Sequence, residues 1–302
     1  MRRVFLTLHS ARPRAIKAAA DFIAQIQNAG MEVHVLADER DALQSSGASN
    51  LVSVQEVSRL EDYYELAVVF GGDGTILRAA DLCRGTGTPI LGVNLGHVGF
   101  LAEAEEDDVQ EVAARVIAGD LIVEERLTVD VQVRVNDEVV ARNWALNEAA
   151  VEKAERQRMI EVVVEIDERP VSRWGCDGVV CATPTGSTAY NFSAGGPVVW
   201  PEVAALLLVP ISAHALFSRP MVVSPDSLLA IEVAPESAPG VLWCDGRRAS
   251  ELPVGARVEV RRGDEPVRLA RLHSSPFADR LVRKFDLPVA GWRGEAARRQ
   301  GE

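Results

Sequence analysis

The chain has 302 residues, of which 47% are hydrophobic and 25% charged, and its formal net charge at pH 7 is -12. This length and hydrophobic content predict a globular protein with two domains. The negative charge argues against a nucleic-acid partner, because a local basic patch would have to grip the phosphate backbone against the field of the whole protein. The longest apolar stretch, residues 203–217, contains Pro210 and His214 and is shorter than the roughly 20 residues of a membrane helix, so no membrane partner is expected.

The four cysteines have neither of the spacings that predict a disulfide framework or a zinc site. They form no C-x-x-C pair, and no histidine lies at ligand spacing. We therefore expect a cytoplasmic protein with reduced thiols and no metal site built from protein ligands alone.

Strand and helix patterns alternate along residues 1–125. Short β-branched runs lie at residues 4–8, 31–37, 66–70 and 89–93, with an amphipathic helix at 14–29 and a last helix that ends at Gly119. This alternation is typical of a parallel sheet with crossover helices. We predict a Rossmann-like α/β domain here.

From Leu127 onwards the hydrophobic period changes to two. Apolar and polar residues alternate strictly over 127–135, Asn136 and Asp137 supply a turn, and strand-like runs continue to residue 272. Residues 126–274 are therefore predicted to form a predominantly β, sandwich-like domain. In residues 275–302, the apolar positions Phe277, Leu281 and Phe285 predict a final helix that packs back on the first domain, followed by a charged, disordered tail from Arg293.

A glycine-rich loop, residues 71–75 (GGDGT), joins a predicted strand to a predicted helix. Backbone N–H groups converge at such a place, so phosphates can approach them closely. The loop is neither a dinucleotide fingerprint nor a Walker A motif. The carboxylate of Asp73 is expected to bind a phosphate-bridging cation or to orient a hydroxyl nucleophile. Arg78, one turn after Thr75, should project toward the loop. The alternative is a tight turn with Asp73 as helix cap and Arg78 as a solvated residue.

A second motif, residues 177–197, combines hydroxyl groups with one aromatic residue. A predicted strand leads into TPTGST (183–188), and Tyr190 opens a short helix. Hydroxyls, exposed amides and an aromatic ring together suit a sugar and a base. The alternative is a capped turn with Tyr190 in the core.

Four motifs, in their order and separations, resemble the NAD kinases, which phosphorylate the adenosine 2′-hydroxyl of NAD. They are GGDGTIL (71–77), NLGHVGFL (94–101), ALNEAAV (145–151) and DGVVCATPTGSTAYNFSAGGP (177–197). GGDGT alone is less specific, because diacylglycerol kinases, sphingoid lipid kinases and phosphofructokinases carry close variants. The chain departs from the family pattern at Ala213, where proline is commoner, and at Gly175-Cys176, which leaves fine substrate preference open. His97 in the second motif could contact phosphate.

The resemblance implies roles for named residues. Asp73 would take or orient the proton of the 2′-hydroxyl, and Glu148 is suited to binding two vicinal ribose hydroxyls. The implied phosphate-donor loop comprises Gly71, Gly72, Gly74 and Thr75. The implied NAD-binding residues are Asp73, Gly74, Arg78, Phe100, Asn147, Glu148, Arg158, Asp177, Thr188, Ala189, Tyr190, Asn191, Phe192, Ser193 and Asp245.

The expected function is therefore phosphoryl transfer to NAD, giving NADP, from ATP or polyphosphate, with Mg²⁺ or Mn²⁺ carried by the nucleotide phosphates. The resemblance also implies a dimer or tetramer. Two other functions stay open. A lipid kinase would need an apolar lipid entrance, whereas the second motif is rich in hydroxyls. A non-catalytic NAD sensor would lose the phosphate loop, whereas Asp73 and its glycines are intact.

Overall fold

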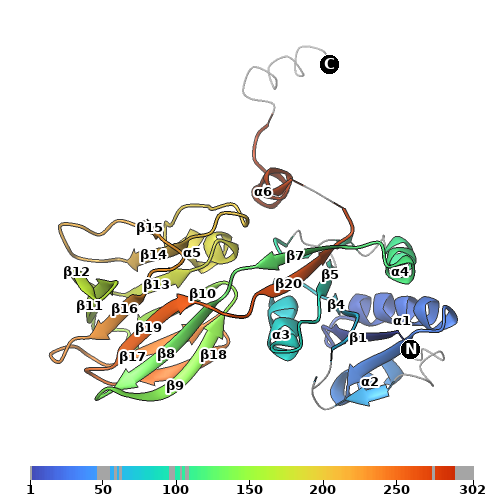
Figure 1. Ribbon diagram of the computed structural model, residues 1–302, viewed down its shortest axis with the longest axis horizontal. Helices are drawn as coiled ribbons and strands as arrows, with labels where there is room; N and C mark the ends of the chain where they lie inside the picture. The colour runs from blue at the N-terminus through green and yellow to red at the C-terminus, as the bar shows by residue number, and fades with distance from the viewer. Residues whose placement is uncertain are drawn as a thin grey trace, which may run out of the picture. The chain divides into compact units, whose positions relative to one another are not determined.

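The computed structural model describes residues 2–45, 55–57, 60, 63–94, 99–102, 104–105, 109–273 and 276–289 (Figure 1). His97 and the tail from Arg293 lie outside these ranges. By internal contacts the chain divides into two units, residues 1–124 with 268–302, and residues 125–267. No helix among the described residues is long and apolar enough to cross a membrane.

The first unit contains an eight-stranded sheet. Its strands lie in the order β3 (Gln55–Val57), β2 (Glu32–Leu36), β1 (Arg3–Leu8), β4 (Leu66–Phe70), β5 (Ile90–Asn94), β20 (Val267–Arg271) and β7 (Ile122–Arg126), and β6 (Ala104–Glu105) pairs with β5. From β3 to β20 the described pairings are parallel. The predicted Rossmann-like α/β architecture is confirmed.

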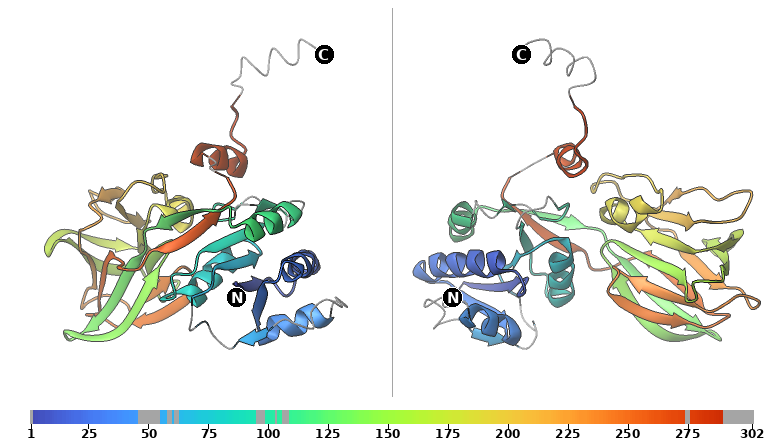
Figure 2. Two further views of the ribbon diagram at one scale, coloured as in Figure 1. Left: turned by 45° about the vertical axis from the view of Figure 1, so that its right-hand side comes forward. Right: turned by 180° about the vertical axis from the view of Figure 1, so that it is seen from behind.

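Four helices connect these strands, namely α1 (Pro13–Asn28), α2 (Ala37–Ser45), α3 (Asp73–Cys83) and α4 (Val109–Ala118). The apolar faces of α1 and α4 pack with one face of the sheet in a single core cluster, and the two helices lie side by side (Figure 2). All five residues of β4 are buried. That explains why its sequence is a continuous apolar run rather than an alternating one.

The strand order places a topological switch point between β1 and β4. The chain leaves β1 toward β2 on one side and leaves β4 toward β5 on the other. In open α/β sheets, ligands bind outside the carboxyl ends of the strands at such a point. The GGDGT loop follows β4 there, next to the end of β1, because Leu8 is paired with Phe70.

The second unit is a sandwich of two six-stranded antiparallel sheets. One has the order β15 (Met221–Val223), β14 (Leu206–Ile211), β13 (Gly178–Ala182), β10 (Glu148–Lys153), β17 (Gly240–Cys244) and β18 (Arg248–Leu252); the other has β12 (Arg169–Cys176), β11 (Ile160–Ile166), β16 (Leu229–Val233), β19 (Arg257–Arg262), β8 (Val129–Val135) and β9 (Glu138–Ala145). Alternate side chains of both sheets share one core. Asn136 and Asp137 have φ of 50° and 64°, as the predicted hairpin turn requires.

The chain returns to the first unit earlier than its sequence suggested. The predicted β-rich domain extends to residue 274, but residues 268–273 belong to the first unit because β20 pairs with β5. The final helix, α6 (Phe277–Phe285), then contacts the segment after β5. The Phe100 ring lies 6.0 Å from the Phe277 ring and 5.7 Å from the Phe285 ring. The helix therefore packs against the first unit, as expected.

Candidate functional site: a phosphate loop and a polar cluster

The carboxylate of Asp73 is held by backbone N–H groups from a distant part of the first unit. Its Oδ2 accepts a hydrogen bond from the Phe100 N–H at 3.0 Å, and its Oδ1 accepts one from the Leu101 N–H at 3.2 Å. The cap position of α3 is Gly72, without a side-chain cap. Asp73 is therefore not the cap that the alternative interpretation required, and a partly exposed carboxylate stands at the start of the helix.

Two glycines allow this close packing. A Cβ on Gly99 would overlap with the Asp73 carboxylate, and a Cβ on Gly71 would overlap with the Thr75 side chain. Gly72 and Gly74, in contrast, have open space where a Cβ would lie, and Gly74 is exposed. The loop thus presents bare backbone at the amino end of α3, where the helix dipole favours an anion.

Arg78 forms ion pairs with two acidic residues of α2. Its guanidinium is 3.1 Å from Glu39 Oε1 and 3.8 Å from Asp38 Oδ2. Glu39 is fully buried, accepts a 2.5 Å hydrogen bond from the Thr7 hydroxyl, and has a pKa that burial raises. Glu39 also accepts a hydrogen bond from the Leu8 N–H at 3.3 Å, at the end of β1 beside the glycine loop, so the projection of Arg78 toward that loop stays a prediction.

In the second unit, Asp245 fixes the start of β10. Its carboxylate accepts hydrogen bonds from the backbone N–H groups of Leu146 at 3.0 Å, Asn147 at 2.7 Å and Glu148 at 3.4 Å. Asp245 has φ of 52°, and the next residue, Gly246, has φ of 61°. This left-handed turn suits glycine and aspartate. It brings the Asp245 carboxylate within hydrogen-bonding distance of the backbone of Asn147 and Glu148.

Glu148 shares this buried position with Asp245. Burial, followed by repulsion from the Asp245 carboxylate, raises the pKa of Glu148 to about 8. Burial also raises the pKa of Asp245, although its three backbone donors act in the opposite direction. Arg248 supplies the nearby positive charge, 3.0 Å from Asp245 Oδ2, and stacks over the Trp144 ring. The site can therefore hold a neutral carboxylic acid beside an ionised one.

The hydroxyl-rich turn packs directly on the Asn-Glu pair. The Thr183 hydroxyl donates to the Leu146 carbonyl at 2.6 Å, and a Cβ on Gly186 would overlap with the Asn147 backbone. The Ser187 hydroxyl bonds to the Val199 backbone at 3.1 Å. These two hydroxyls are used inside the turn, while Thr188, at the end of the 3₁₀ turn η2 (Thr185–Thr188), is partly exposed.

The short helix α5 (Tyr190–Ser193) separates exposed from structural residues. Ala189 and Tyr190 are partly exposed, and Phe192 and Ser193 are exposed. Asn191 is fully buried and donates to the carbonyls of Ser187 and Pro197, each at 3.1 Å. Of the residues predicted in this helix, Asn191 thus stabilises the turn rather than presenting its side chain to a ligand.

Asp177 lies between β12 and β13 beside a lysine that the sequence analysis did not select. Lys153 Nζ is 2.5 Å from Asp177 Oδ1, and this hydrogen bond is the main reason why the pKa of Asp177 is lowered. Ser212 and His214 act in the same direction. The signal available in the sequence was slight: Lys153 is one of only three lysines and closes the strand that Glu148 opens.

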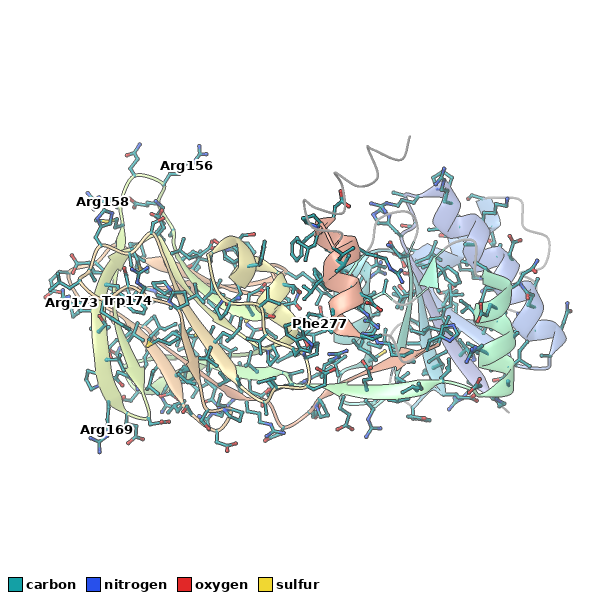
Figure 3. The ribbon with its side chains drawn as sticks, turned by 90° about the horizontal axis from the view of Figure 1, so that it is seen from above. Arg156, Arg158, Arg169, Arg173, Trp174 and Phe277 are labelled. Carbon is teal, nitrogen blue, oxygen red and sulfur yellow. The ribbon has the colours of Figure 1, made fainter. Side chains whose placement is uncertain are left out.

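Arg158 is not brought to this cluster by any described contact. It lies exposed on the loop of residues 154–159, next to Arg156, and both side chains point outward in Figure 3. The structure therefore groups Asn147, Glu148, Asp245 and the 183–193 turn, and places Lys153 with Asp177. It leaves Arg158 apart.

Sequence comparisons identify relatives along nearly the whole chain. A profile of the ATP-NAD kinase N-terminal domain matches residues 8–121, and a profile of the ATP-NAD kinase C-terminal domain matches residues 146–272. NAD kinase 2 of Streptomyces avermitilis is 60% identical over 293 residues, which cover 97% of each chain. The NAD kinase of Thermobifida fusca is 58% identical over 305 residues, covering 99% of this chain and 93% of that protein.

Two solved structures share the fold. Yeast NADH kinase complexed with NADH has a TM-score of 0.82 at 24% identity, covering 97% of this chain and 88% of that chain. An NAD kinase from Archaeoglobus fulgidus in complex with ATP has a TM-score of 0.69 at 24% identity, covering 95% and 100%. These likenesses concern the fold, whereas the profiles and the high identities concern descent. The chain therefore belongs to the NAD kinase family and is an NAD kinase enzyme.

Proposed function

We propose that this enzyme transfers the terminal phosphoryl group of ATP to the 2′-hydroxyl of the adenosine ribose of NAD, giving NADP, with Asp73 as general base. The observation that carries this proposal is the Asp73 carboxylate, fixed by two backbone N–H groups at the head of α3. The complexes of related folds with NADH and with ATP support both substrate classes.

The chemistry assigns one task to each part of the first unit. Asp73 accepts the proton of the 2′-hydroxyl, whose oxygen forms a bond to the γ-phosphorus while the bond to the β-phosphate oxygen breaks and ADP leaves. The bare backbone of Gly72 and Gly74 stabilises the charge on the phosphoryl oxygens. Since little covalent chemistry falls to the protein, orientation of the two substrates accounts for most of the rate.

The second unit supplies the residues that we assign to NAD. Glu148 and Asn147 stand at the start of β10, where Asp245 fixes their backbone. A carboxyl group there can bind two vicinal ribose hydroxyls. Asp177, Thr188, Tyr190 and the exposed end of α5 offer further polar and aromatic contacts. We assign Asn191 and Asp245 to holding these residues in place.

The residues around the loop fit a divalent ion that arrives with the donor. Asp73 provides one carboxylate, and no group of three or more His, Cys, Asp or Glu residues suited to a metal exists within the described ranges. We therefore propose that the donor phosphates, with Asp73 as the protein group nearest to them, hold Mg²⁺ or Mn²⁺. When bound, the ion neutralises phosphate charge.

We extend the proposal to a cytoplasmic homo-oligomer that uses ATP or polyphosphate. The cytoplasm is supported by four free, buried cysteines. Size-exclusion chromatography with light scattering tests the assembly, and a monomer at micromolar concentration would contradict it. Parallel assays with ATP and polyphosphate measure the donor preference.

The decisive experiment follows NADP formation from NAD with ATP and Mg²⁺, using a coupled NADP-specific dehydrogenase. Asp73→Asn should lower kcat by about two orders of magnitude or more, which is typical of the loss of a general base. Asp21→Asn, an exposed position on α1, serves as the matched control. Near-normal kcat in Asp73→Asn would contradict the base assignment, and measurable NAD binding without product from either donor would favour a sensor.

A further inference from the structure

The backbone segment that holds Asp73 is itself held by the final helix. Leu101 donates its N–H to Asp73 Oδ1, and the carbonyl of Phe100 accepts a hydrogen bond from Arg280 Nη1 at 3.3 Å. This carbonyl and this N–H belong to the same peptide unit. A guanidinium of α6 is therefore connected to the proposed base through one planar amide.

Side chains reinforce this connection. The Phe100 ring packs against Phe277 and Phe285, two turns apart on α6, with Arg280 between them in the sequence (Phe277 is labelled in Figure 3). The next carbonyl is also fixed, because fully buried Arg271 of β20 donates from Nη1 to Leu101 at 2.9 Å. Four residues of the C-terminal part of the chain thus contact Phe100 and Leu101, the residues that bind Asp73.

This arrangement leaves the carboxylate little freedom. A Cβ on Gly99 would overlap with it, so the carboxylate also packs closely against the residue that precedes Phe100. A cation at a peptide carbonyl polarises the amide and makes its N–H a stronger donor. The effect is local, since Arg280, Phe100, Leu101 and Asp73 all lie in the first unit.

We propose that Arg280 is a positioning residue for the phosphoryl-transfer reaction, which orients Asp73 by polarising and fixing the peptide between Phe100 and Leu101. The inference rests on the proposed role of Asp73 as base. It gives α6, an amphipathic helix far from the glycine loop in the sequence, a part in the reaction.

Steady-state kinetics of Arg280→Gln test the proposal, with NAD and ATP varied in turn. Because glutamine keeps a donor but lacks the charge, kcat should fall about tenfold, the size of one charge-assisted hydrogen bond, while the KM for ATP changes less than about twofold. Arg280→Lys should recover kcat to within about threefold of the parent enzyme, since the charge returns. Arg283→Gln removes the same charge from an exposed position on α6 and is the matched control.

A double variant separates positioning from general damage. Adding Arg280→Gln to Asp73→Asn should lower the residual kcat by less than about twofold, because both changes act on one group. A further tenfold loss, or no rescue by Arg280→Lys, would overturn the proposal. Full loss in Asp73→Asn with unchanged kcat in Arg280→Gln would overturn this inference alone, whereas near-normal kcat in Asp73→Asn would overturn the proposed function with it. Thermal melts by circular dichroism confirm folding of each variant.

Discussion

Both units contain hydrogen bonds between a carboxylate and backbone N–H groups, but these bonds serve different purposes in the two units. In the α/β unit, two backbone N–H groups hold one carboxylate, that of Asp73, which stays partly exposed. In the β-rich unit, one carboxylate, that of Asp245, holds three backbone N–H groups and is almost completely buried. A carboxylate held by backbone donors, such as Asp73, can also contact a substrate. A carboxylate that holds the backbone, such as Asp245, has its acceptor sites occupied. The difference separates a group suited to chemistry from one suited to positioning.

Glu148 differs from both of these carboxylates. It is buried beside Asp245, and its pKa of about 8 places its titration near physiological pH. Asp73 has one backbone donor for each of its oxygens. Glu148 instead has a like-charged neighbour. These two acids of similar chemistry are therefore prepared for different tasks by their surroundings.

The largest effect is expected where the held carboxylate is displaced. In Gly99→Ala the new Cβ overlaps with the Asp73 carboxylate, which must rotate away from the N–H groups of Phe100 and Leu101. Misplacing a reacting group by about 1 Å costs about 10²-fold in rate, so kcat should fall by about this factor. The measurement is steady-state kinetics in the coupled NADP assay.

The control for this variant removes the group that collides. In an Asp73→Ala background there is no carboxylate to displace, and Gly99→Ala should then have less than about a threefold further effect on the residual rate. An equal loss in both backgrounds would mean that the Gly99 backbone matters for a reason other than Asp73.

Loss of the Asp245 carboxylate should affect kcat less than it affects NAD binding and the stability of the fold. Asp245→Asn removes the charge that binds the N–H groups of Leu146, Asn147 and Glu148, so unfolding free energy should fall by about 2 kcal/mol and the KM for NAD should rise about tenfold. Chemical denaturation and NAD titration measure the two effects. Asp226→Asn, at an exposed turn, is the matched control. A loss confined to kcat would contradict the positioning role.

The fold class could be predicted because hydrophobic period is a local property. The change of period near Leu127 marked the boundary between an α/β and a β-rich region, and both were found. The pairing of β20 could not be predicted in the same way. A short run such as VRLAR fits either sheet, and only its tertiary partner, β5, assigns it to the first unit.

For the site, the sequence indicated the loops but not their supports. The GGDGT motif indicated Asp73 and the bare backbone beside it. The N–H groups of Phe100 and Leu101, which donate to Asp73, lie 27 and 28 residues away and could not be predicted from the spacing. The spacing also did not reveal buried Glu39, the α2 residue that pairs with Arg78. Such partners are set by tertiary packing, which leaves no periodic signal in one chain.

Glu148 predicts a pH-dependent stability. Its folded pKa of about 8 lies above the model-peptide value of about 4.3. The protonated form is favoured in the folded state, so its stabilising contribution is complete below the unfolded pKa and is lost as pH rises through about 8. In Glu148→Gln, which cannot ionise, unfolding free energy between pH 6 and pH 9 should decline less than in the parent, by on the order of 2–4 kcal/mol. Urea denaturation at both pH values measures this decline, and an equal decline in Glu148→Gln and in the parent would contradict the prediction.

The smallest effect is expected at Lys153, which forms an ion pair with a third carboxylate, that of Asp177. Asp177 is paired through a side chain rather than through backbone, and both partners are partly exposed. Such ion pairs contribute about 0.2–1 kcal/mol because solvent screens them. Lys153→Met should therefore raise the KM for NAD only two- to threefold, roughly the affinity change that this energy represents. The pKa of Asp177 should return toward its usual range. Lys17→Met, which removes the same charge from an exposed position on α1, should leave KM unchanged, and an equal change in both would assign the effect to net charge instead.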